Sequence, residues 1–173
     1  MTISEISAEI PDWQREEKSL FEWAPPRALL ASIRRYQRAQ HYAQPFAWVI
    51  KVCAVLQHRF WSIVTGADIP INTQIGGGLL IPHPNGIVIH PGVTIGPNCL
   101  ILQQVTLGSN EAGDLPMIGG HVDIGAGAKL IGKVSIGNHA KIGANAVVLI
   151  DVPAYATAVG VPAKIISKTE SKS

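Results

Sequence analysis

The chain has 173 residues, of which 47% are hydrophobic, and its formal net charge is +2. This length fits one domain with a modest extension. Eight lysines and arginines lie in residues 1–66 and no arginine follows Arg59, so the sustained basic surface of a nucleic-acid groove is missing. The first twenty residues contain five acidic residues rather than the apolar core of a signal peptide, and the apolar run 46–56 is interrupted by Lys51. That run is too short to span a bilayer, and we expect a cytoplasmic protein that binds no nucleic acid.

Residues 1–66 form the first predicted unit, a short N-terminal α-helical extension. Pro25-Pro26 fits the first positions of a helix, and apolar residues recur at helical spacing as far as Tyr36. A second helix is predicted to begin at Pro45 and to end at Gly66. Most aromatic residues lie in this unit. They favour a core or a subunit contact, and a peripheral contact with a membrane or an assembly complex is the alternative interpretation.

Residues 67–166 form the second predicted unit, in which aliphatic residues recur every six positions. They are Ile75, Ile81, Ile87, Ile89, Ile95, Ile101, Leu107, Ile118, Ile124, Leu130, Ile136, Ile142 and Val148. A period of six fits neither a helix nor a flat strand, but it fits a coil of three short strands per turn with the aliphatic residues inside. The sequence therefore predicts a β fold, a left-handed parallel β-helix of hexapeptide repeats, followed by a C-terminal tail at 167–173.

The repeat is interrupted twice. Two residues are added between Ile87 and Ile89, and eleven residues instead of six separate Leu107 from Ile118. Residues 108–117 are therefore expected to form a loop ejected from the coil, and loops on rigid scaffolds often carry functional sites.

His83 is the histidine that the spacing favours as a general base. Asp68 precedes it by fifteen residues, nearly the three hexads of one coil. We expect this carboxylate one strand spacing away, where it would orient the imidazole and raise its basicity. Gln103 follows His83 by twenty residues, one coil plus the insertion, and is expected on the same face. The alternative is a His–Asp pair that only closes the end of the coil.

The other histidines and the two cysteines do not predict a metal centre. Three histidines must converge to hold a catalytic zinc ion, and the spacing of the six in this chain does not bring three together. Cys53 and Cys99 lack CxxC spacing, so we expect free thiols and no metal.

Five segments resemble the serine acetyltransferase family of hexapeptide-repeat acyltransferases, including its relatives that acetylate bacterial exopolysaccharide and capsule units. These segments are ADIP (67–70), HPNGIVI (83–89), LQQVTLG (102–108), the run 124–148 and GVPAK (160–164), in order and with nearly matching spacing. The resemblance implies that His83 is the general base, Asp68 its orienting partner and acetyl-CoA the co-substrate. It also implies a homotrimer with acyl-CoA between neighbouring coils. The implied CoA contacts are Gly108, Ser109, Ala126 and Gly127 for the pantetheine arm, Ala144, Pro162, Ala163 and Lys164 toward the adenine, and Lys141 or Lys164 for a phosphate.

The chain departs from the family where the acceptor would bind. The family has an Asp before its catalytic His, where this chain has Pro82, and an Arg-His pair in the ejected loop, where it has Leu115-Pro116. The coil has no arginine to bind an amino-acid carboxylate. We therefore expect an acetyl-CoA-dependent O-acetyltransferase acting on a saccharide hydroxyl in polysaccharide biosynthesis. The acceptor would be held by Asn85, Gln103 and Gln104. The alternatives are a serine O-acetyltransferase of cysteine biosynthesis and a non-catalytic hexapeptide scaffold.

Overall fold

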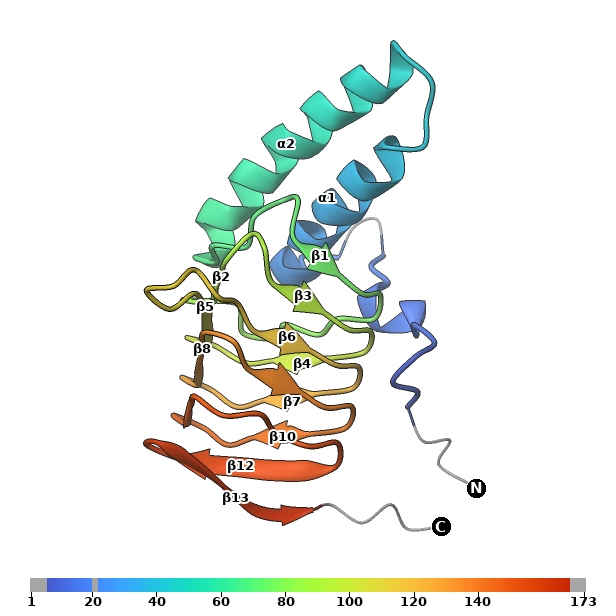
Figure 1. The fold of residues 1–173 in the computed structure, drawn as a ribbon. Coiled ribbons are helices and arrows are strands. Elements are labelled where there is room, and N and C mark those ends of the chain that lie inside the picture. The colour runs from blue at the N-terminus through green and yellow to red at the C-terminus, as the bar shows by residue number, and fades with distance from the viewer. Residues whose placement is uncertain (1–5, 20–21, 169–173) are drawn as a thin grey trace, which may run out of the picture.

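A hairpin of two helices stands on one end of a triangular coil in the computed structural model, which describes residues 6–19 and 22–168 (Figure 1). Helix α1 spans Pro25–Ala39 and helix α2 spans Phe46–Thr65. Pro25 occupies the first position of α1, where its missing N–H costs nothing. Gly66 ends α2 with a φ of 65°, a left-handed conformation that glycine adopts without strain. Both predicted helices are thus confirmed.

The rest of the chain winds through short strands that stack into three sheets. The strands are β1 (Gln74–Ile75), β2 (Val88–Ile89), β3 (Thr94–Ile95), β4 (Leu100–Ile101), β5 (Thr106–Gly108), β6 (Met117–Ile118), β7 (Asp123–Ile124), β8 (Lys129–Ile131), β9 (Ser135–Ile136), β10 (Lys141–Ile142), β11 (Val147–Val148), β12 (Ala156–Gly160) and β13 (Ala163–Lys168). We call β1, β3, β6 and β9 the first face, β4, β7, β10 and β12 the second, and β2, β5, β8 and β11 the third. All pairs within a face are parallel, and β13 closes the far end as an antiparallel hairpin with β12.

The core of the coil is the predicted aliphatic ladder. All thirteen repeating aliphatic residues are buried, and so are the smaller residues four positions after them, such as Val93, Val105 and Ala128. Burial alternates along each short strand, with one side chain inside the prism and the next outside. This arrangement confirms the left-handed parallel β-helix.

The two-residue insertion lies elsewhere than the repeat predicts. Leu80 pairs with Leu100, twenty residues later. The amide of Gln104, by contrast, donates to the carbonyl of Asn85 at 3.0 Å, which belongs to the eighteen-residue register of the regular coils. The two additional residues therefore lie between Leu80 and Asn85, where the chain bulges outward at the exposed His83.

The ejected loop follows β5, as predicted. Thr106 pairs with Lys129, a separation of twenty-three residues instead of eighteen, so five residues are extra in this coil. Asn110 and Asp114 close the loop on itself, because the Asp114 amide donates to the Asn110 side chain at 2.9 Å. The register therefore resumes unchanged below the loop.

The N-terminal segment is bound along the coil, which the sequence did not predict. A short 3₁₀ helix, η1, spans Trp13–Glu16. The buried Asn98 accepts a hydrogen bond from the Asp12 amide (2.8 Å) and donates to the carbonyls of Ser7 (2.7 Å) and Ile10 (2.8 Å). The Glu16 carboxylate accepts from the Leu79 amide at 3.0 Å. Polar contacts therefore hold residues 7–16 against the outside of the first two coils.

Helix α2 exposes a large apolar surface to solvent. Phe46, Trp48, Leu56, Phe60 and Ile63 are all more than half exposed. Exposed apolar patches of this kind mark contacts with a partner. No helix in the described part of the chain is long and apolar enough to cross a membrane. The peripheral membrane or assembly contact expected from the aromatic residues stays a prediction.

The C-terminal tail expected at 167–173 falls mostly outside the described residues. Strand β13 runs through Lys168, so residues 167–168 belong to the closing hairpin.

Candidate active site

One corner of the coil, between the second and third faces, brings five predicted site residues together. It is held by backbone hydrogen bonds between successive coils. These run from the Gln104 amide to the Asn85 carbonyl (3.0 Å), from Gly127 to Gln103 (2.8 Å) and from Asn145 to Ala126 (2.8 Å). Three predicted acceptor residues and two predicted CoA residues, Asn85, Gln103, Gln104, Ala126 and Gly127, therefore form a column, which we call the corner column.

His83 projects from the bulge at the top of the corner column. Its side chain is exposed, and it lies two residues before Asn85. Asp68 lies on the third face, where it pairs with Val88 of the next coil, and its side chain is also exposed. No hydrogen bond joins Asp68 to His83 within residues 6–19 and 22–168. His83 and Asp68 thus lie on neighbouring coils, and their roles as general base and orienting carboxylate stay predictions.

His58 of α2 is a neighbour of Asp68 that sequence reasoning missed. Its Nε2 lies 2.8 Å from the Ile69 carbonyl oxygen, and the Asp68 carboxylate acts on its charge. Burial is the largest influence and lowers the pKa of His58, while the Ile69 carbonyl and Asp68 oppose that shift. The nine residues between His58 and Asp68 span a helix end, so no periodic signal in the sequence could have revealed this contact.

The remaining predicted CoA residues are spread along the coil, from the third face to the closing hairpin. Gly108 ends β5 and Ser109 follows it, so both stand at the opposite edge of the third face from the corner column. Ala144 continues the corner downward, beside the Asn145 amide that bonds to Ala126. Lys141 lies on β10 of the second face, and Pro162, Ala163 and Lys164 belong to the closing hairpin at the far end of the coil (Figure 1). These contacts stay predictions.

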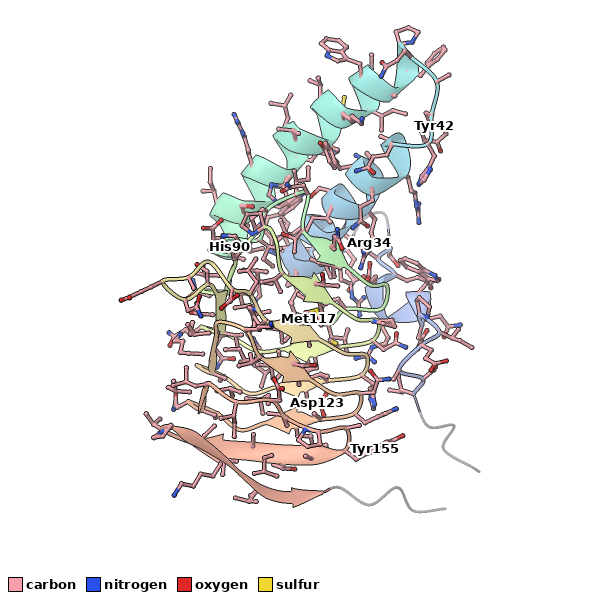
Figure 2. The ribbon with its side chains drawn as sticks, in the orientation of Figure 1. Arg34, Tyr42, His90, Met117, Asp123 and Tyr155 are labelled. Carbon is pink, nitrogen blue, oxygen red and sulfur yellow. The ribbon has the colours of Figure 1, made fainter. Side chains whose placement is uncertain are left out.

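Among the described residues, no cluster of three or more His, Cys, Asp or Glu side chains could hold a metal ion. His121 and His139 lie one coil apart and place their Nδ1 atoms 2.8 Å from each other. His139 in turn stacks on Tyr155, with ring centroids 4.6 Å apart. His139 and Tyr155 line a cavity with residues 6–9 of the N-terminal segment, and Figure 2 shows Tyr155 on the side of the coil where this segment runs.

Comparison with known proteins identifies the relatives of the chain. No protein-family model matches it. A serine acetyltransferase of Buchnera aphidicola is 42% identical over 141 residues, which are 78% of this chain and 52% of the relative. A serine acetyltransferase solved in complex with CoA matches with a TM-score of 0.69 and 36% identity, over 83% of this chain and 58% of the other. A soybean serine acetyltransferase complexed with serine matches with a TM-score of 0.62 and 32% identity, over 80% of this chain and 70% of the other. The chain spans about half the length of the curated relatives it matches.

These relatives contradict the saccharide acceptor that the sequence favoured, and they support serine, which was the alternative. The expectation drew on Pro82, on Leu115-Pro116 in the loop and on the lack of arginine in the coil. The last ground left out the arginines of the N-terminal unit, which pack against the coil. Arg15 lines a cavity with residues of the first coil, and Arg34 donates to the carbonyls of Ile75 (2.5 Å) and Gly76 (2.6 Å). The lack of arginine in the coil sequence therefore does not mean that arginine is absent from the surface around the coil.

Proposed function

This chain belongs to the serine acetyltransferase-like family, and we propose that it transfers the acetyl group of acetyl-CoA to the hydroxyl group of L-serine. The observation that carries the proposal is the 32% identity, over 80% of the chain, to a soybean serine acetyltransferase that was solved with serine. The similarity to a serine acetyltransferase solved with CoA supports the second substrate.

His83 is the proposed general base. Its imidazole takes the proton of the serine hydroxyl while the hydroxyl oxygen attacks the thioester carbonyl carbon of acetyl-CoA. The tetrahedral intermediate then collapses, the carbon–sulfur bond breaks, and the imidazolium returns its proton to the departing CoA sulfur. The products are O-acetylserine and CoA. The exposed position of His83, in a bulge that projects from a rigid coil, suits a group that must reach both substrates.

Acetyl-CoA is proposed to lie along the third face between Gly108-Ser109 and the corner column. The adenine end would then extend past Ala144 toward the closing hairpin, where Lys164 could meet a phosphate. Asn85, Gln103 and Gln104 are proposed to contact the acceptor from the top of the corner column.

A homotrimer is the proposed assembly. Met117 and Val161 of the coil are 61% and 71% exposed, and Trp48 and Ile63 of α2 are 64% and 83% exposed. Exposed apolar surface of this extent usually marks a contact with another protein chain. A stable monomer in light scattering would contradict the trimer and with it the intersubunit site for acetyl-CoA.

The test is release of CoA thiol from acetyl-CoA with L-serine as acceptor. We expect kcat/KM for L-serine of at least about 10⁴ M⁻¹s⁻¹, the low end of ordinary enzymes. His83→Ala should lower kcat by about 10²- to 10⁴-fold, the usual contribution of a general base. His41→Ala is the matched control, because His41 is an exposed histidine in the turn between α1 and α2. Absence of L-serine turnover in the wild type would disprove the proposed function, and full activity of His83→Ala would disprove the role of His83.

A further inference from the structure

A small cavity extends to Pro82, at the start of the bulge that carries His83. Its volume is about 200 Å³, and it lies between the N-terminal unit and the first coil. The coil side is formed by Leu79, Leu80, Ile81 and Pro82, and Pro82 is the residue directly before His83. The cavity is apolar except for two arginines, Arg15 of η1 and Arg27 of α1.

Arg15 is unusual because part of its guanidinium is buried without a partner. Its Nε and Nη1 atoms are both shielded from solvent, and neither hydrogen-bonds to any group in residues 6–19 and 22–168. Buried donors in native proteins are nearly always satisfied, and an unsatisfied one points to a strained or functional position. The loss is larger for a charged donor, because its full desolvation cost is not recovered.

Arg34, nineteen residues further on, shows what a structural arginine looks like in the same fold. Its Nε and Nη2 bond both oxygens of Glu16 at 2.9 and 2.8 Å, and its Nη1 bonds Gln37 at 2.9 Å. Arg27 is also engaged, although loosely, since it lies 3.5 Å from the half-exposed Glu22. Of these three arginines, Arg15 is the one whose buried guanidinium donors have no acceptor among the described residues.

The cavity has the dimensions and chemistry of a site for a small carboxylate. Pockets for drug-sized ligands span roughly 300–1,000 Å³, so a volume of about 200 Å³ suits a few heavy atoms rather than a nucleotide or a sugar chain. A carboxylate is the acceptor that a guanidinium matches best, through charge-assisted hydrogen bonds. An apolar wall strengthens such bonds because it excludes competing water.

We propose that Arg15 binds the carboxylate of the acceptor amino acid and thereby places its hydroxyl at His83. This inference rests on the proposed function, and it assigns the specificity for an amino acid to the N-terminal segment. It accounts for an amino-acid acceptor in a chain whose ejected loop has Leu115-Pro116 and no arginine.

The experiment compares L-serine with L-serinamide, in which an amide replaces the carboxylate. Wild-type protein should have a kcat/KM about 10- to 100-fold higher for L-serine, the value of one or two charge-assisted hydrogen bonds. Arg15→Met should lower kcat/KM for L-serine by that factor, leave L-serinamide unchanged and leave the KM of acetyl-CoA unchanged. Arg15→Lys keeps the positive charge but loses the planar guanidinium. Its kcat/KM for L-serine should lie between those of the wild type and Arg15→Met. The matched control is Arg35→Met, since Arg35 is exposed on α1 and bonds Gln57 of α2.

Folding and binding measurements make the outcomes separable. Arg15→Met should melt at least as high as wild type, because it removes a buried charge that has no partner. If it does not fold, Arg15→Lys carries the test. Calorimetry with L-serine, on protein saturated with CoA, reports binding without turnover. If the wild type binds L-serine and Arg15→Met does not, the inference is supported, even when the wild type shows no turnover. Absence of turnover in the wild type contradicts only the proposed function. Intact L-serine turnover with an unchanged L-serine to L-serinamide ratio in Arg15→Met overturns the inference alone, and failure of the wild type to bind L-serine overturns both.

Discussion

Arg34 joins three parts of the molecule, and its removal should be among the most damaging single changes in the N-terminal unit. It extends from α1 to the top of the coil (Figure 2), and the side chains of Arg34 and Glu16 are each only 8% exposed. Replacing it with Met leaves the buried Glu16 carboxylate with one partner among the described residues, the Leu79 amide. The replacement removes the donor from the carbonyls of Ile75 and Gly76. It also removes the guanidinium that lies 5.4 Å from the Trp13 ring.

Breaking a buried ion pair from one side costs about 3–5 kcal/mol, which is a large part of the roughly 5–15 kcal/mol stability of a typical domain. We therefore expect Arg34→Met to lower the free energy of unfolding in urea by about 3–5 kcal/mol at a fixed protein concentration. Arg27→Met is the control, because its pair with Glu22 is exposed and 3.5 Å long, and it should cost under about 1 kcal/mol.

A double-mutant cycle gives the second criterion. Glu16→Met added to Arg34→Met removes the stranded carboxylate, so the double variant should be less destabilised than the sum of the two single variants. A cost below about 1 kcal/mol for Arg34→Met, or strictly additive effects in the cycle, would refute the view that this pair fixes the N-terminal segment to the coil.

Acidification should destabilise the fold through His58. Burial lowers the pKa of His58 below the ordinary 6.5, so the folded state resists protonation. The free energy of unfolding should therefore be highest above about pH 6.5 and should fall as the pH drops below that value. Urea titrations should show a weaker pH dependence for His58→Gln than for the wild type. Burial raises the pKa of the Cys99 thiol to about 11, whereas Cys53 is exposed. Iodoacetamide should therefore modify Cys53 alone in the native protein and both thiols in denaturant, and native labelling of Cys99 would show that the coil opens. Asn98→Ala should release residues 7–12, seen as faster amide exchange there with the coil still protected, because it removes three side-chain hydrogen bonds to that segment.

The sequence alone determined the coil. Its period of six follows from geometry that is local to each turn, because every sixth residue must fill the inside of the prism, as the burial of Ile95, Ile101 and Leu107 illustrates. The helix boundaries were also local, since they depend on Pro25 at one end and on the left-handed Gly66 at the other. The family followed from motifs that the coil carries in order.

The tertiary structure decided the register of the coils at the site. It also decided which side chains of the N-terminal unit contact the coil. Ile87 lies opposite Val105, one of the smaller buried residues, so the ladder steps from Ile81 to Ile89 over eight residues. Only the pairing between coils places the two additional residues at the bulge of His83. Arg15 and His58 belong to the N-terminal unit, outside the hexapeptide repeat. Their positions depend on how the N-terminal segment and α2 pack, and this packing is set by side-chain contacts distributed over distant residues. A periodic pattern can therefore define the scaffold, but it carries no information about which charges the rest of the chain brings to the scaffold's surface.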